Sequence, residues 1–193
     1  MLGMKRTYVL LLVLIGLAVL SCKNGGNRNQ KEASERAEYK TIEKVDIRMD
    51  IPAGMTAQDD LNEFAILQFA NPKTGRYMIV LSDEKTMLAD MMSEDGETET
   101  SAPDMDTYTS MIAGMMNPQD WEITDTLTVN GHKALMAAFS GETEGQSVQY
   151  RLGIVEGPDA FYQIMLWTPE EKSNGFDEFG MRVLKSFAII SPQ

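Results

Sequence analysis

The chain has 193 residues, of which 29 are Asp or Glu and 17 are Lys or Arg, so its formal net charge is −12. This negative balance repels the phosphates of nucleic acids and excludes a nucleic-acid-binding role. A single cysteine and a single histidine are too few to build a His/Cys metal cluster, and no histidine-based catalytic triad is assembled from the sequence.

Residues 1–21 are predicted to be a lipoprotein signal peptide. Lys5 and Arg6 precede the apolar run 7–20, which as a helix would reach only about 21 Å. Because the hydrocarbon core of a bilayer is roughly 30 Å thick, this run is short for a membrane span. Its layout is typical of a secretory signal, and a retained membrane anchor is the alternative.

Cys22 ends this segment within Val19-Leu20-Ser21-Cys22, which resembles the lipobox of bacterial lipoproteins. In that family the thiol becomes a thioether to diacylglycerol, the signal is cut before the cysteine, and the new amine is acylated. The resemblance therefore implies lipidation of Cys22 and attachment to the membrane through lipid. A buried free cysteine that ends an apolar segment is the alternative.

Residues 22–40 are predicted to form a flexible tether. The stretch from Lys23 to Lys40 contains no Val, Ile, Leu or Phe, so it cannot bury enough apolar area to offset the entropy lost on ordering. In the Bacteroidota lipoproteins that this signal resembles, acidic residues just after the cysteine accompany surface export. "KNGGN" lacks them, which favours a lipid-anchored protein that faces the periplasm.

Residues 41–193 are predicted to form one α+β domain, with 10 Lys or Arg against 26 Asp or Glu. Alternating or short apolar runs predict strands, which are listed here in chain order: 46–51, 64–70, 76–82, 121–129, 132–139, 146–157, 160–167 and 186–190. Asn130-Gly131 predicts a tight hairpin turn, as do Pro72 with Gly75. Trp121, Ile123, Leu127 and Val129 are expected to share one face of their strand.

Two helices are predicted to cover the sheet. The first is indicated by apolar residues at helical spacing: Met105, Tyr108, Met111, Ile112 and Met115. The second is indicated by the capping box Thr168-Pro169-Glu170-Glu171, followed by a stripe of Phe176, Phe179, Val183 and Leu184. We therefore expect an antiparallel sheet of about six or seven strands covered by helices.

Over most of residues 46–190 this order of elements resembles the PsbP-like proteins. The matching features are an early strand ending at Ile51-Pro52, a hairpin, a helix, "VNGHKA", two tyrosine-bearing strands, a second helix and Lys185-Ser186-Phe187. The resemblance implies an α/β/α sandwich and a binding or assembly role rather than catalysis. No metal site is inferred from the resemblance.

Three features are tempting as sites but have simpler interpretations. His132 sits beside a turn and is interpreted as a turn histidine. The acidic stretch 93–106 lacks the spacing of a calcium loop, so a solvated loop is favoured. Thioethers are ligands for copper(I) and the chain has fifteen methionines, but Met105, Met111 and Met115 fall on the apolar helix stripe, which favours core filling.

These observations predict a non-catalytic envelope lipoprotein without a cofactor. Its domain would dock a ligand or an envelope protein with a basic surface, and the exposed side of the strands around Tyr150 and Tyr162 is the expected docking region. The alternative is a periplasmic hydrolase that uses paired carboxylates, which sequence cannot place in one cleft.

Overall fold

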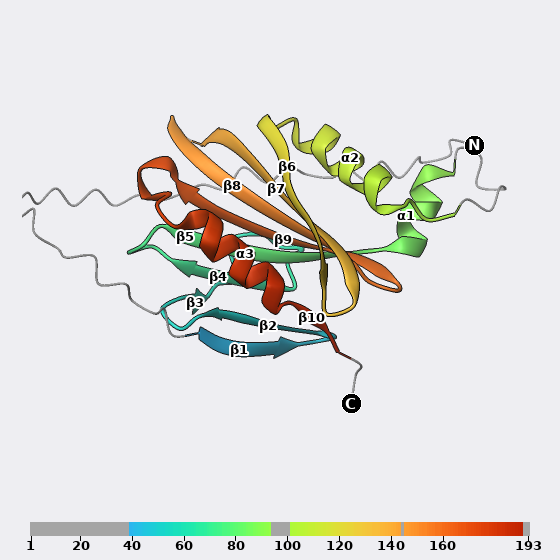
Figure 1. Cartoon of the computed structure of the whole chain (residues 1–193), viewed down its shortest axis with the longest axis horizontal. Coiled ribbons are helices and arrows are strands. Elements are labelled where there is room, and N and C mark those ends of the chain that lie inside the picture. Colours follow the sequence, from blue (N-terminus) through green and yellow to red (C-terminus); the bar gives the residue numbers. More distant parts are fainter. Residues whose placement is uncertain (1–38, 94–100, 144, 191–193) are drawn as a thin grey trace, which may run out of the picture.

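The structure, a computed structural model, describes residues 39–93, 101–143 and 145–190. Within these residues it is an α+β arrangement of strands and helices (Figure 1). The strands are β1 (Tyr39–Lys44), β2 (Ile47–Pro52), β3 (Thr56–Ala57), β4 (Leu67–Asn71), β5 (Arg76–Glu84), β6 (Gln119–Val129), β7 (His132–Thr143), β8 (Gln146–Glu156), β9 (Ala160–Pro169) and β10 (Ala188–Ile189). The helices are α1 (Lys85–Met92), α2 (Met105–Met116), the 3₁₀ turn η1 (Glu170–Lys172) and α3 (Phe176–Ser186).

Two antiparallel sheets form the framework of the domain. The main sheet has seven strands in the order β3-β4-β5-β9-β8-β7-β6, and the small sheet has three in the order β1-β2-β10. The small sheet lies at the bottom of Figure 1, and α3 crosses the main sheet above it. The predicted α+β class and the predicted size of the main sheet are confirmed.

One face of the main sheet, here the α3 face, is buried beneath α3 and the small sheet. From β2, the alternating residues Ile47, Met49 and Ile51 are fully buried in this layer. Helix α3 lies very close to the sheet, because a Cβ atom added at Gly153 would lie 2.7 Å from Leu184 Cδ1. Glycine at this position therefore permits the close packing of α3 on β8.

The opposite face, here the α2 face, packs beneath α2. Its buried side chains include Leu135, Ala137, Leu152, Ile154 and Phe161, which contact Tyr108 and Ile112 of the helix. Alternate residues of β8 thus point to opposite faces, as strand geometry requires. Helices on both sides of one antiparallel sheet make the predicted α/β/α sandwich.

The predicted hairpin turns are confirmed. Asn130 and Gly131 join β6 to β7 with φ angles of 48° and 89°, the left-handed pair that a two-residue hairpin turn requires. Gly75, with φ of 67°, ends the turn between β4 and β5. The residues of each turn were therefore sufficient to predict where these two hairpins turn.

The prediction that four apolar residues of β6 share one face is wrong. Register shifts interrupt the β6–β7 pairing between Gln119 and Glu122 and between Ile123 and Asp125. Such a bulge inserts a residue and changes the face on which later residues lie. Trp121 therefore packs on the α2 face, whereas Leu127 and Val129 pack on the α3 face.

The capping box predicted at Thr168 is also wrong. Thr168 is fully buried at the end of β9, and its hydroxyl oxygen accepts a hydrogen bond from Arg76 Nη1 at 2.9 Å. Only the short turn η1 follows, and α3 begins at Phe176 after Gly175, which has φ of 68°. The Thr168 hydroxyl is therefore bonded to Arg76 of a distant strand and does not cap a helix.

Elements that were not predicted from the sequence include α1 and β1. Helix α1 follows β5 directly and has one buried residue, Leu88. Strand β1 begins at Tyr39, before the domain boundary expected at Thr41. The predicted signal peptide, Cys22 and most of the tether lie outside the described residues. Among the helices that are described, none is long and apolar enough to span a bilayer.

Candidate docking face

Five aromatic side chains form a row across five neighbouring strands on the α2 face. We call this the aromatic row; in spatial order it contains Trp121, Phe139, Tyr150, Trp167 and Tyr77. The strand registers pair Phe139 with Tyr150, Tyr150 with Trp167, and Trp167 with Tyr77. Cross-strand pairing thus brings together residues from β5 to β9 that are far apart in sequence.

The rings of the aromatic row stand upright on the sheet. Ring centroids are 5.5 Å apart for Trp121 and Phe139, 4.8 Å for Phe139 and Tyr150, and 5.5 Å for Tyr77 and Trp167. The planes of these pairs differ by 26°, 3° and 10°. Because this separation is close to the strand spacing of roughly 4.8 Å, the ring faces cover one another. In these stacked pairs the ring edges, rather than the covered faces, remain available to a partner.

The aromatic row is only partly covered. Phe139 and Trp167 are buried, but Trp121, Tyr150 and Tyr77 are half-buried. The half-buried Leu81 and Met165 lie alongside them in the same apolar clusters. Helix α2 covers one end of this face, and the remaining part leaves apolar side chains in contact with solvent.

A loop, residues 58–66, covers the other end of the face. Its Leu61 and Ala65 pack against the cluster that contains Trp167. The Gln68 side chain fixes the loop, because its Oε1 accepts hydrogen bonds from the backbone N–H groups of Leu61 and Asn62 at 2.8 and 3.0 Å. Phe64, on the same loop, is 67% exposed.

Acidic residues lie on the loop and the helix that flank the open part of this face. The loop 58–66 and α2 together contain four Asp or Glu and no Lys or Arg. We call these four residues the acidic border, and all are exposed: Asp59, Asp60, Glu63 and Asp106. The acids of β6 point to the α3 face instead, since Glu122 and Asp125 pair with Ala138 and Met136. The candidate site thus combines exposed apolar groups with a negative potential.

A buried polar cluster attaches α2 to the sheet. The Tyr108 hydroxyl donates to Asp83 Oδ2, and Gln163 Nε2 donates to the same oxygen at 2.8 Å and to the Tyr108 hydroxyl at 2.9 Å. Burial, followed by the negative charge of Asp83, raises the pKa of Tyr108 well above its usual value. The phenol is therefore a neutral hydrogen-bond donor that positions the helix.

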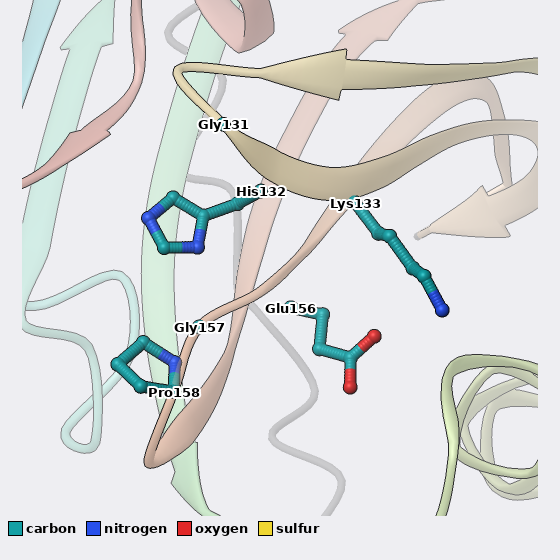
Figure 2. Close-up of a pocket in the computed structure, with 6 residues that line it drawn as sticks. All are labelled: Gly131, His132, Lys133, Glu156, Gly157 and Pro158. Carbon is teal, nitrogen blue, oxygen red and sulfur yellow. The ribbon is translucent and has the colours of Figure 1, made fainter.

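A separate open hollow of about 320 Å³ lies at the hairpin end of the sheet (Figure 2). His132 and Pro158 lie on one side of it, and the side chains of Lys133 and Glu156 on the other. The Glu156 carboxylate already accepts a hydrogen bond from Lys85 Nζ at 3.0 Å. His132 directly follows the β6–β7 turn, which is where the sequence placed it.

A second hollow, of about 280 Å³, adjoins the first at Lys133 and is lined by Asp104 and Asp106. Asp104 is the N-cap of α2, and its carboxylate accepts a hydrogen bond from the Thr107 backbone N–H at 2.8 Å. That bond lowers the pKa of Asp104, whereas a general acid needs a raised pKa. No group of three or more metal-ligating side chains is found in the part of the chain that is described.

The structure separates the two tyrosines that the sequence assigned to one exposed region. Tyr150 belongs to the aromatic row, but Tyr162 is 3% exposed and points into the α3-face core. Its hydroxyl donates to Asp46, and burial raises its pKa. The prediction for Tyr162 is wrong because the small sheet covers that part of β9.

The methionine prediction is correct only in part. Met105 and Met111 pack against the core beneath α2, but Met115 is exposed. Three further methionines are exposed on α1: Met87, Met91 and Met92. Of the acidic stretch 93–106, residues 94–100 lie outside the described residues.

Sequence reasoning did not identify the aromatic row as a unit. Trp167, Phe139 and Tyr77 each lie within a predicted strand, but their proximity depends on the registers of three strand pairs. The sequence did contain one hint of the row, which is that each of these strands contains an aromatic residue.

No protein-family model matches the sequence, and no curated protein is similar to it. Solved structures do share the fold. The cyanobacterial PsbP (CyanoP) of Synechocystis sp. PCC 6803 superposes with a TM-score of 0.50 at 10% identity, over 85% of this chain and 99% of that one. LpqN, involved in cell envelope biogenesis of Mycobacterium tuberculosis, gives a TM-score of 0.50 at 10% identity, over 80% and 91%.

A protein from Bacteroides thetaiotaomicron VPI-5482 aligns with a TM-score of 0.48 at 11% identity, over 75% of this chain. The chain spans 45% of that protein's length. At such low identities the similarity concerns the fold alone. The chain therefore has a PsbP-like fold, which agrees with the expectation from sequence.

Proposed function

We propose that this protein is a lipid-anchored docking protein of the bacterial cell envelope and that it is not an enzyme. The observation that carries the proposal is the half-open aromatic row with its acidic border. A monomeric protein rarely leaves a large apolar area uncovered unless that area binds something. The same fold in LpqN, a protein involved in cell envelope biogenesis, supports this setting.

The anchor of the proposed protein is Cys22. The short apolar run, the preceding Lys5 and Arg6, and the Val19–Cys22 sequence support lipidation at this thiol. More than one acyl chain gives stable attachment, because each buried methylene contributes about 0.8 kcal/mol. The sequence after the cysteine supports an orientation toward the periplasm.

Docking is favoured over catalysis by the chemistry of the open surfaces. The aromatic row offers apolar edges and hydroxyls rather than a nucleophile or a general base. In the two hollows, Glu156 is paired with Lys85, and Asp104 caps α2. The alternative, a hydrolase with paired carboxylates, requires two acids directed at one substrate.

Replacing Cys22 tests the anchor. We expect Cys22→Ser to abolish incorporation of labelled palmitate and to leave an uncleaved or misprocessed precursor, because a hydroxyl does not form the thioether. The matched control is Ser21→Ala, which keeps a small residue before the cysteine and should retain labelling. Labelling of the serine variant would contradict lipidation at Cys22.

Site-specific photocrosslinking in intact cells tests docking. A photoreactive phenylalanine at Tyr150 should capture a discrete partner, whereas the same residue at the exposed Glu178 of α3 should not. A panel of ester, amide and glycoside substrates provides the test for the alternative. Turnover that is lost in Glu156→Gln or Asp106→Asn would contradict the non-catalytic role.

A further inference from the structure

Exposed apolar side chains concentrate on the α2 side of the domain. Among the described residues, the large apolar side chains that are exposed include Phe64, Met87, Met91, Met92, Met115 and Ile123, all on loop 58–66, α1, α2 or β6. The other exposed one is Val45, in the β1–β2 turn. Methionine side chains are flexible and polarizable, so they adapt to partners of different shape.

Charge is divided between the two sides in a similar way. The acidic border contributes four negative charges and no positive ones. On the opposite side, β1, β2 and α3 contain five Lys or Arg against four Asp or Glu. The loop and the helix that flank the open apolar surface therefore carry negative charges alone.

We propose that the aromatic row and its acidic border bind a basic amphipathic segment of a partner protein. This inference rests on the proposed docking function and names the chemistry of its partner. The apolar side chains of the segment would contact Tyr77, Tyr150, Leu81, Met165 and Phe64. Its Lys or Arg residues would face the acidic border, and the tyrosine hydroxyls would supply hydrogen bonds.

The size of the face fits a short helix or strand. The aromatic row crosses five strands, so it extends over four strand spacings, or roughly 19 Å. A helical segment of about 13 residues, or an extended one of about six, covers this length. Such a segment is within the usual range for peptide recognition by a groove or sheet surface.

Other occupants fit the observed surface less well. A sugar ring stacks on an open aromatic face, but three pairs of neighbouring rings in the row are stacked on each other, which covers the faces between them. Anionic lipid is repelled by the acidic border. A symmetric dimer through this face would place two acidic borders against each other, which costs free energy.

Intrinsic fluorescence can report binding directly, because the two tryptophans of the chain are Trp121 and Trp167 of the aromatic row. The probe is a 14-residue helical peptide of Lys and Leu with the two residue types on opposite faces. It is added to the full mature chain. We expect a saturable change in tryptophan emission, with an on-rate that falls steeply as salt rises.

Two matched pairs of variants locate the binding surface. Asp59→Lys with Glu63→Lys should weaken peptide binding by about tenfold, whereas Glu43→Lys with Glu178→Lys makes the same change in net charge on the opposite side and should have little effect. Phe64→Ser should weaken binding several-fold. Val45→Ser removes an equally exposed apolar group elsewhere and should not.

Several results would overturn the inference. One is an equal loss of peptide affinity in the two charge-reversed pairs, and another is equal binding of a scrambled Lys/Leu peptide. Binding to anionic phosphatidylglycerol vesicles instead of the peptide, or self-association of the chain in sedimentation, would show that the face has a different occupant. Capture of a partner through Glu178 rather than Tyr150 would leave the docking function standing and contradict this surface. Substrate turnover would instead contradict the proposed function itself.

Discussion

The two faces of the main sheet differ in how completely they are covered. On the α3 face, side chains of α3 and the small sheet exclude solvent, and many of the buried residues have no exposed area. On the α2 face, the helix covers one end and the loop 58–66 covers the other, so part of the aromatic row remains open. One face therefore supplies a closed core that supports the fold while the other retains a surface for binding.

The comparison suggests how the domain tolerates an open apolar surface. Exposed aromatic and methionine side chains contribute little to stability by burial, since the gain depends on the apolar area removed from water. The α3 face compensates with a tightly packed layer that leaves no space for even one added methyl group at Gly153. Substitutions should therefore affect stability more strongly on the α3 face.

The largest difference is expected between two glycine-to-alanine substitutions. Gly153→Ala on the α3 face should lower the free energy of unfolding by about 1–3 kcal/mol, because the new methyl group overlaps Leu184. Gly114→Ala in α2, where a Cβ meets no atom within 4 Å, should raise it by about 0.5–1 kcal/mol. Urea unfolding at neutral pH measures both. Equal effects of the two variants would contradict the proposed difference in packing.

A smaller effect is expected from the buried tyrosines, since each face contains one that donates to an aspartate. Tyr108→Phe on the α2 face and Tyr162→Phe on the α3 face should each lower the free energy of unfolding by about 1–2 kcal/mol. The pKa of each hydroxyl is raised, and burial is the largest cause of the rise. The measurement is urea unfolding of each variant at pH 8.

The same two tyrosines predict a loss of stability in alkali. A phenol with a raised pKa in the folded state contributes fully below its unfolded pKa of 10.0, and the contribution is lost as pH rises toward the folded value. The native protein should therefore lose stability above about pH 10, and each Phe variant should lose less. An identical pH dependence in the native protein and both variants would refute this assignment.

The smallest effect concerns the two tryptophans. Trp121 is half-buried at the open end of the aromatic row and Trp167 is 2% exposed, so acrylamide should quench Trp121 more readily. Trp121→Phe should remove the accessible emission and change stability by no more than about 1 kcal/mol. Strong quenching of the remaining Trp167 would show that the row is more open than the structure indicates.

Local features of the sequence predicted the fold better than they predicted the candidate site. The turn at Asn130-Gly131 was predictable because its φ angles are set by two adjacent residues. The helix start at Thr168 was not, because Arg76 from a distant strand occupies the Thr168 hydroxyl. The bulge near Ile123 also left no clear local signal, and it redirects the second half of β6.

The docking face depended even more on long-range structure. Tyr150 and Tyr162 have similar sequence surroundings, and only the position of the small sheet decides that Tyr162 is buried. The aromatic row arises from strand registers, which a single sequence does not specify. The composition shows that the domain is acidic, but it does not show where on the surface the acidic residues lie.

The pairing of β10 with β2 constrains when this domain can complete its fold during synthesis. Ala188 pairs with Arg48, and the Ile190 backbone N–H donates to the Asp46 carbonyl oxygen at 2.7 Å. The last described residues therefore add a third strand to the β1–β2 hairpin. A chain emerging from the ribosome amino end first cannot form these contacts until residues 188–190 have been made. A chain that must cross a translocation pore unfolded would benefit from this delay, because its N-terminal strands lack their final partner until the C-terminal end arrives.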